Sequence, residues 1–562
     1  MSATRDAAEA GERALDRRSA WALFLCLAAL YLATAVGLPD NPDAEVEFQT
    51  TRSLAREQTF ALGETPEAQA IEALAFDIVR GVDGRVYSWF GVGQALLAVP
   101  FYGVGVLAAE VWPAIEERHA ADIAYGFARS EYFEHLFVGL KNPLLGAWTC
   151  ALVFLAARRL GAARGSSAVA AALLGVTTYL WPQARASLND VQATWAFVLA
   201  FERWLAWRKS ERVLDAVLCG AAAAWVVLTR VGLAPAVLVL VLWIVVERAR
   251  AGRAVAISTQ AFLATLCGGA ALFCGANQAR FGRLFETGYG PMLEDGTFFS
   301  YPWYSGLAGL LVSPGKGLLW FATGLVIAIV GWRSLERRVA LLVLLLVVAI
   351  FAPVVPTQAW HGAYTFGPRY VLPAVALAWI GVAPVLERAW RSASRSALLA
   401  LAGLFAFGSA ATWGGVAVDT MTHLDLAAQC AREAWPELPG KDERERDEAR
   451  FVALQWDLRF AAPFAHWRIL AHKLGERNEF YTPRELFGLA SEKVVQPGHA
   501  REEGFRHFAW VDLSERLGGV VWPVWALLAG LFAVGAVLAR SVARASGTGA
   551  GRRSSPAPAA PN

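Results

Sequence analysis

The chain has 562 residues, of which 56% are hydrophobic and 18% are charged. Its mean hydropathy is +0.40 and long apolar runs recur from end to end, which excludes an ordinary soluble protein and indicates a polytopic α-helical membrane protein. The net charge of only +3 gives no argument for a nucleic-acid partner. Five of the six cysteines lie inside apolar runs, so neither a disulfide framework nor metal-ligand spacing is visible.

The apolar runs predict an all-α bundle of about twelve membrane-spanning helices, preceded by a cytoplasmic tail at 1–19. The first run is longer than the apolar core of a signal peptide, so we expect it to be retained as a span. The predicted spans are 20–38, 137–157, 165–181, 191–207, 213–228, 231–246, 255–275, 306–332, 339–355, 368–386, 397–418 and 519–539.

Basic residues mark alternate connections between these spans, near 158–164, 208–212, 248–253, 333–338 and 388–395, and both tails. The positive-inside rule places these connections and both termini in the cytoplasm. The segment 91–111 is also apolar and long enough to cross. A crossing there would move every later basic connection outside, so we expect this segment to lie in, or dip into, the outer interface.

This topology leaves two large regions on the outer side. The first outer loop covers 39–136, and a periplasmic loop or small domain covers 419–518. Within the second region, the apolar and basic stretch 451–474 predicts one helix on the membrane surface. The Ser/Gly/Ala/Pro-rich tail at 540–562 is predicted to be disordered and cytoplasmic.

Four carboxylates stand where the chain leaves the first span: Asp40, Asp43, Glu45 and Glu47. Pro42-Asp43 is typical of a helix start, so capping and the helix dipole alone could explain these acids. Alternatively, one of them is a general base held rigidly at the membrane surface. A second outer acid, Asp190, stands where we expect it to cap a span. Acids beside hydrocarbon at two outer helix ends favour an active site.

Four cations lie at outer positions: Lys141, Arg230, Lys316 and Arg369. Snorkelling explains any one of these cations. Several cations on one side, next to segments interrupted by glycine, favour a phosphate or pyrophosphate site. The dipeptide Asp83-Gly84 predicts a turn. Candidates for lining a substrate pocket near these segments are Tyr87, His361 and Tyr364.

The order of these motifs resembles the C-type (GT-C) membrane glycosyltransferases, which include protein O-mannosyltransferases, lipid A aminoarabinose transferases and bacterial relatives. The acidic motif directly follows the first span. After it come Asp83-Gly84-Arg85 with Tyr87-Ser88, then Ala157-Arg158-Arg159-Leu160-Gly161, then Asp190, and finally Gly367-Pro368-Arg369-Tyr370 at the start of a late span. The resemblance covers about residues 20–418.

The resemblance implies a hexosyl or pentosyl transferase that moves a sugar from a polyprenyl-phosphate donor to an acceptor hydroxyl at the periplasmic face of a bacterial inner membrane. Asp43 is then the base, with Glu45 or Glu47 as the second candidate and Asp190 as the second outer acid. Arg369 is the leading contact for the lipid phosphate, with Lys141, Arg230 and Lys316 behind it. The residues show no recognisable metal-binding motif, and binding of a divalent cation between Asp43 and Asp190 is left as an alternative. The sequence names neither the sugar nor the acceptor, which is a glycan, a lipid or a protein.

Two other functions compete with the enzyme. One is a flippase or transporter of lipid-linked saccharide, which the break at 313–317 favours, although outer acids and the lack of an internal repeat do not. The other is a non-catalytic membrane protein that keeps the GT-C fold. The enzyme hypothesis requires Asp43 and Asp190 to face the same outer space.

Overall fold

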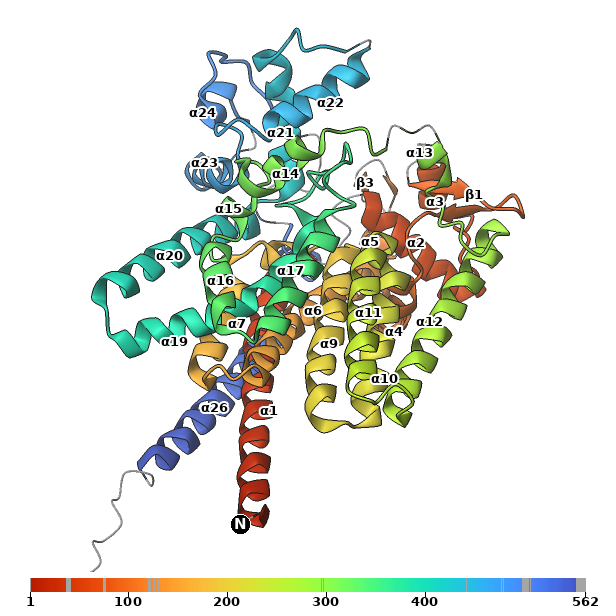
Figure 1. Ribbon diagram of the computed structural model, residues 1–562. Helices are drawn as coiled ribbons and strands as arrows, with labels where there is room; N and C mark the ends of the chain where they lie inside the picture. Colours follow the sequence, from red (N-terminus) through yellow and green to blue (C-terminus); the bar gives the residue numbers. More distant parts are fainter. Residues whose placement is uncertain are drawn as a thin grey trace, which may run out of the picture.

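The computed structural model describes residues 2–36, 42–73, 77–119, 123–124, 127–128, 131–294, 296, 298–440, 442–476, 478, 480–497, 505 and 507–551. The described chain is mainly helical, with two small antiparallel hairpins, so it is a helical bundle with minor β structure (Figure 1). Asp40 lies outside the described residues.

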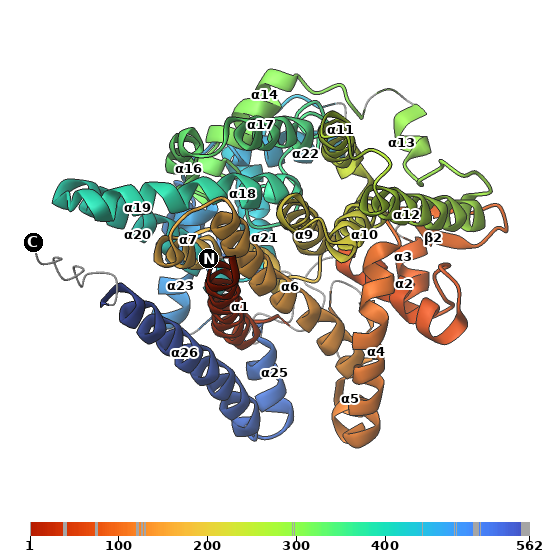
Figure 2. The same cartoon turned by 60° about the horizontal axis from the view of Figure 1, so that its bottom comes forward.

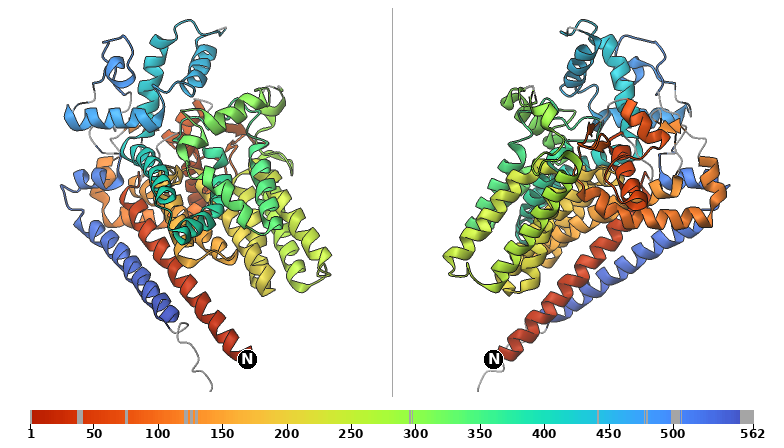
Figure 3. Two further views of the ribbon diagram at one scale, coloured as in Figure 1. Left: turned by 60° about the vertical axis from the view of Figure 1, so that its left-hand side comes forward. Right: turned by 90° about the vertical axis from the view of Figure 1, so that its right-hand side faces the viewer.

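Long helices form the body of the molecule, and burial separates its centre from its rim. About 72% of the most apolar window of α6 (Tyr132–Arg159) is buried, and 78% of the window over Arg369–Ser392, against 11% for α26 (Trp522–Gly551). The first two are therefore central, while α26 is mostly exposed. Figure 3 shows α26 running beside α1 (Ser2–Ala33). Further helices of the body are α7 (Arg164–Thr177), α9 (Asn189–Ser210), α10 (Val213–Thr229), α11 (Ala234–Arg250), α12 (Ile257–Phe281), α17 (Arg337–Phe351), α18 (Leu372–Ala378), α19 (Val382–Ser392) and α20 (Arg395–Ala417).

Seven described helices are long and apolar enough to cross a membrane, so the bundle is that of a multi-pass membrane protein. One of the seven covers Gly93–Val111, the segment that the alternation of charge predicts not to cross. The count of about twelve spans stays a prediction. The predicted span 306–332 is interrupted: α14 (Trp303–Val312), α15 (Leu318–Phe321) and α16 (Leu325–Gly331) replace one continuous helix. The interruption falls where Pro314 and two glycines stand, which disfavour a helix interior.

The two ends of the bundle differ. In Figure 1 the N-terminus and the connection α9–α10 lie at the lower end, and the connection α19–α20 projects to the left. The first loop and helices α21 to α24 lie at the upper end. Ion pairs join three of the basic connections, since Arg208 contacts Glu336 (3.2 Å) and Arg248 contacts Glu211 (2.8 Å). These connections lie away from the two large loop regions, as the alternation of charge predicts.

Helix α4 (Gly93–Val111) covers the segment predicted to stay in the interface. In Figure 2, where α1 and α9 are seen close to end-on, α4 is seen along its length, so it lies across the direction of the bundle. The first loop also holds α2 (Pro42–Glu57), α3 (Pro66–Ala73), α5 (Pro113–His119) and the strands β1 (Ile78–Arg80) and β2 (Val86–Ser88). These strands pair Ile78 with Ser88, and Gly84 takes a φ of 79° between them, which confirms the predicted turn.

The last outer region consists of α21 (Thr420–Ala434), α22 (Glu443–Leu454), α23 (Ala462–Gly475), α24 (Pro483–Phe487) and α25 (Ala509–Arg516). The single helix predicted over 451–474 is wrong, because a turn in which Arg459 N donates to Asp457 Oδ1 (2.8 Å) and the following Pro463 separate α22 from α23. The predicted disorder from 540 is also wrong in part, since α26 continues to Gly551. Residues 552–562 lie outside the described residues.

Candidate active site

Helix α2 presents Asp43 in its first turn. Pro42 begins the helix, where its missing N–H costs nothing, and Asp43 and Glu45 follow as the acids of that turn. The Asp43 carboxylate contacts the Arg369 guanidinium, with 2.8 Å between Oδ2 and Nη1.

Asp190 lies in the first turn of α9, and the prediction that it caps this helix is wrong. The N-cap position is Leu188, and no side chain caps the helix there. The preceding segment is held by amides from other helices: Asn142 donates to Ala186 O (2.6 Å) and Leu188 O (2.7 Å), and Gln94 donates to Ser187 O (2.7 Å). The Asp190 carboxylate is thereby free to turn toward arginines.

A tightly held loop delivers Arg369. The loop before it contains Gly362 and Gly367, both with a φ of 75°, a conformation that glycine adopts without strain. Its carbonyls are fixed from three sides, since Tyr179 donates to Pro368 O (3.2 Å), Gln183 to Phe366 O (2.7 Å) and Lys316 to Ala363 O (2.9 Å). Arg369 therefore has a fixed origin at the start of the 3-10 helix Arg369–Val371.

Arg230 occupies the extended break between α10 and α11, with φ −150° and ψ 100°. The first loop packs closely against this break. A Cβ on Gly91 would lie 2.3 Å from Leu228 O, so only glycine allows the approach. The aromatic and glycine-rich start of α4 thus brings the first loop onto the helix end that carries Arg230.

These elements assemble a cluster of two carboxylates and two guanidinium groups, which we call the carboxylate–arginine cluster: Asp43, Asp190, Arg230 and Arg369. Arg369 contacts Asp43 and, through Nε, lies 3.9 Å from Asp190 Oδ2. Arg230 Nη1 contacts Asp190 Oδ1, and the two guanidinium groups lie 4.3 Å and 5.0 Å from the Tyr370 ring centroid. The acids that the sequence predicted to share one space are therefore brought together.

Exposure divides the cluster into an accessible pair and a buried pair. The side chains of Arg230 and Asp43 are 21% and 16% exposed, whereas those of Arg369 and Asp190 are 9% and 2% exposed. A ligand can reach Asp43 and Arg230 most readily. Arg369 and Asp190 lie behind them, and buried charges of this kind persist only because they are paired.

Asp77 belongs to this site, and the sequence analysis missed it. It lies directly before strand β1 with a φ of 53°, a left-handed conformation that aspartate tolerates better than most residues. Its side chain hydrogen-bonds to Asp43. Burial, and then the nearby Asp43 charge, raise the pKa of Asp77 to about 8, so at neutral pH Asp77 holds a proton and donates to Asp43. No local motif marks this residue.

The two glutamates of α2 face different neighbours. Glu47 is buried beside Lys141 of α6, and burial raises its pKa well above its ordinary value. Neither Glu47 oxygen nor Lys141 Nζ has a hydrogen-bond partner among the described residues. Glu45 instead accepts from Gln49 Nε2 (2.8 Å) and lies 3.2 Å from His135 Nε2.

The remaining predicted residues lie around the cluster. Lys316 donates to carbonyls of the Arg369 loop, and burial lowers the pKa of His361 to about 3, so this imidazole is neutral. Tyr364 is 52% exposed and packs on Phe451 of α22, 5.2 Å between ring centroids. The Tyr87 hydroxyl donates to Asp83 (2.7 Å) and not to the cluster.

The described residues contain no group of three or more His, Cys, Asp or Glu side chains that could hold a metal ion. A cation shared by Asp43 and Asp190 would have to replace the Arg369 guanidinium, which already contacts both carboxylates. The arrangement itself can hold a proton at Asp43 and an anionic group at Arg230.

No protein-family model and no curated protein matches this sequence. Among solved structures, the chain is similar to ArnT of Cupriavidus metallidurans bound to undecaprenyl phosphate, at 16% identity over 83% of this chain and 78% of that one, with a TM-score of 0.45. It is also similar to an Archaeoglobus fulgidus oligosaccharyltransferase tethered to an acceptor peptide, at 13% identity over 79% of this chain and 63% of that one, with a TM-score of 0.44.

Both of these proteins are GT-C membrane glycosyltransferases, the class that the ordered motifs of this sequence resemble.

Proposed function

We propose that this protein is an integral-membrane glycosyltransferase that moves a sugar from a polyprenyl-phosphate donor to an acceptor hydroxyl. The observation that carries the proposal is the contact of Asp43, an accessible carboxylate, with an arginine that also approaches a second carboxylate. A second arginine, Arg230, stands on the accessible side. A base and a guanidinium group side by side are what the transfer of a sugar from a phosphate requires.

The reaction follows from the positions of these groups. The acceptor oxygen attacks the anomeric carbon while Asp43 takes the hydroxyl proton. The bond between the anomeric carbon and the phosphate oxygen breaks, and the lipid phosphate leaves with the electron pair. Arg230, being more accessible than Arg369, meets the developing phosphate charge first.

Arg369 and Asp190 orient the two reacting groups. Arg369 holds the Asp43 carboxylate in place, and Asp190 fixes Arg230. Lys141 is a further cation beside Glu47 at the buried side of the cluster. Asp77 keeps a proton at neutral pH and thereby avoids a third negative charge beside Asp43.

We further propose that the site faces the periplasm of a bacterial inner membrane, with both termini cytoplasmic. The position of the basic connections, away from the two large loop regions, supports this orientation (Figure 1). In a cysteine-free background, an impermeant thiol reagent should label a cysteine placed at Glu448 in intact spheroplasts. It should label one at Ser394 only after permeabilisation, and the reverse pattern would contradict the orientation.

The interruption at 313–317 was the sequence feature that favoured a transporter. In the structure it packs against fixed backbone: Gly315 N donates to Gln455 O (3.0 Å), and Lys316 is bonded to the Arg369 loop. The break therefore supports the loop that delivers Arg369, which fits the enzyme.

The proposal is tested with purified protein in liposomes and a panel of radiolabelled polyprenyl-phosphate sugars. The assay measures both the release or transfer of sugar and the movement of intact donor between leaflets. We expect turnover with at least one donor by the wild type and none above background by Asp43→Asn. Donor movement without any cleavage would identify a transporter and contradict the proposal.

A further inference from the structure

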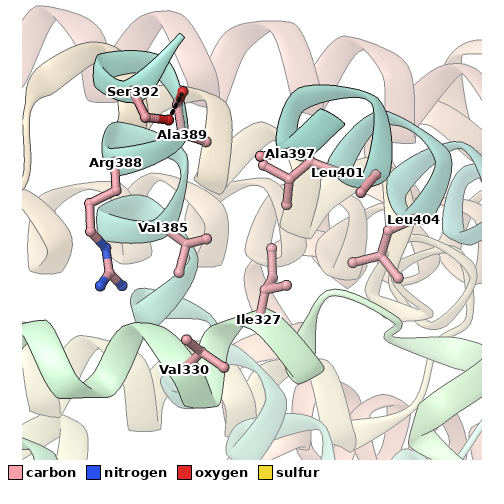
Figure 4. Close-up of a pocket in the computed structure, with 10 residues that line it drawn as sticks. Ile327, Val330, Val385, Arg388, Ala389, Ser392, Ala397, Leu401 and Leu404 are labelled. Atoms are coloured by element: carbon pink, nitrogen blue, oxygen red, sulfur yellow. Dashed lines mark hydrogen bonds between the residues drawn. The ribbon is translucent and has the colours of Figure 1, made fainter. Parts of the chain in front are cut away.

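A ligand-sized space lies beside the basic connection between α19 and α20. It is an apolar groove of about 650 Å³ between α16, α19 and α20. Figure 4 shows Ile327, Val385 and Leu401 pointing into this groove from the three helices. Its volume falls within the range of ligand pockets, about 300–1,000 Å³.

One charged residue joins this groove to a polar pocket. Arg388 of α19 lines the apolar groove and also a neighbouring pocket of about 220 Å³ beside Ser334 and Arg391. The only hydrogen bond described for Arg388 runs from Nε to Pro384 O (3.4 Å). Among the described residues, its two Nη groups have no protein acceptor, in contrast to Arg391, which is paired with Glu387.

We propose that this groove is a binding site for an anionic glycerophospholipid of the surrounding bilayer. One acyl chain would lie in the groove along Ala397–Leu404, a length of about 10 Å on α20. The phosphate would reach the Nη groups of Arg388 at the mouth of the polar pocket. The layout of the site matches that of a phospholipid. The apolar groove accepts the acyl chain, and at one end it opens onto a cation that can bind the phosphate.

The position of the site selects the ligand. The groove opens toward the basic connections, where anionic lipid headgroups are attracted by about 1 kcal/mol per arginine. Arg388 belongs to a basic connection that the positive-inside rule places in the cytoplasm, whereas the cluster stands in the predicted outer region. The donor lipid phosphate would therefore be on the wrong side for Arg388. This inference does not depend on the proposed enzymatic function.

The test uses the full-length protein, delipidated in detergent, with phosphatidylglycerol or phosphatidylcholine carrying the same acyl chains. Native mass spectrometry counts the retained lipid. We expect the wild type to retain phosphatidylglycerol about fivefold more than phosphatidylcholine. Arg388→Gln should abolish this preference. The matched control is Arg395→Gln, which removes an equal charge from an exposed position that lines neither space, and it should keep the preference.

A third variant tests the groove itself. Ala400→Trp fills the apolar space from the exposed face of α20 and should lower retention of both lipids. Equal retention of the two lipids by the wild type would overturn the proposal. So would equal losses in Arg388→Gln and Arg395→Gln, unchanged retention in Ala400→Trp, or displacement of phosphatidylglycerol by an equimolar polyprenyl phosphate.

Discussion

Helix α2 carries charged groups on two faces, and the two sets differ in whether the protein itself supplies all of their partners. Toward α4 and α6, Arg52 and Arg56 contact Glu131 at 3.0 Å and 3.2 Å, and Tyr102 donates to the same carboxylate at 3.1 Å. We call this set the Glu131 network. On the side of the loop that precedes Arg369, Asp43 contacts Arg369. There, Asp190 Oδ2 and Arg369 Nε have no hydrogen-bond partner among the described residues.

The difference shows which set is built for a ligand. The Glu131 network satisfies its charges within the protein, so it anchors the first loop to the bundle. The carboxylate–arginine cluster leaves buried polar atoms whose partners must be water or substrate, because an unsatisfied buried group is costly. Substitutions in the first set should therefore affect stability, and those in the second should affect turnover.

Among substitutions of the residues around Asp43, the largest effect is expected for Arg369→Lys. Lysine keeps the charge but cannot contact two carboxylates through a planar fork, so Asp43 loses its fixed position. We expect kcat/KM to fall by about 10²–10³-fold, the range for the loss of one oriented group. Steady-state assays with whichever donor is turned over give this value. Activity within threefold of wild type would show that Arg369 does not orient the reaction.

Asp77→Asn should give a smaller change that depends on pH. As the pH rises through about 8, Asp77 of the wild type loses its proton and adds a negative charge beside Asp43. The amide cannot ionise and keeps a donor toward Asp43. We therefore expect similar rates at pH 6.5 and a higher rate for the variant at pH 9, by up to about tenfold. Parallel pH profiles would refute this role.

The same residue makes a prediction for stability. Its folded-state pKa of about 8 lies above the ordinary value of 3.8, so its contribution is fully present below about pH 4 and is lost as the pH rises to about 8. Thermal unfolding should show that Asp77→Asn removes part of the decline in wild-type stability across this window. A variant with an unchanged slope would mean that Asp77 is ionised in the folded protein.

Glu47→Gln should change turnover by less than about threefold, although Glu47 lies only four residues from Asp43. Burial already favours the neutral form of Glu47, so the isosteric amide resembles the native group. Initial rates measure this effect. A loss comparable to that of Asp43→Asn would make Glu47 the base.

Glu131→Gln should have the smallest effect on turnover. Removing this carboxylate leaves Arg52 and Arg56 without their shared partner, which destabilises the first loop. We expect a melting temperature lower by several degrees and a kcat per folded molecule within about twofold of wild type. A selective loss of kcat at unchanged melting temperature would erase the distinction between the two faces of α2.

The sequence predicted much of this arrangement because the relevant signals are local. Asp43 follows the end of the first predicted span, Arg369 follows a Gly-Pro motif, and Arg230 interrupts an apolar run. The partners of Asp190 could not be predicted from its position at a helix start, which pointed to a cap. Asp77 was missed because only the tertiary placement of the β1–β2 hairpin brings it to Asp43. The interruption at 313–317 was visible, but its packing on the Arg369 loop was not.

The most direct test is the rate of the chemical step in Asp43→Asn with the donor already bound. Saturating labelled donor is mixed with enzyme, and sugar release is followed in a single turnover, with donor affinity and melting temperature measured on the same preparation. We predict wild-type affinity and a rate per folded molecule lower by about 10²–10⁴-fold, the range for removal of a general base. An unchanged rate with bound donor would contradict the assignment of Asp43 and, with it, the proposed active site.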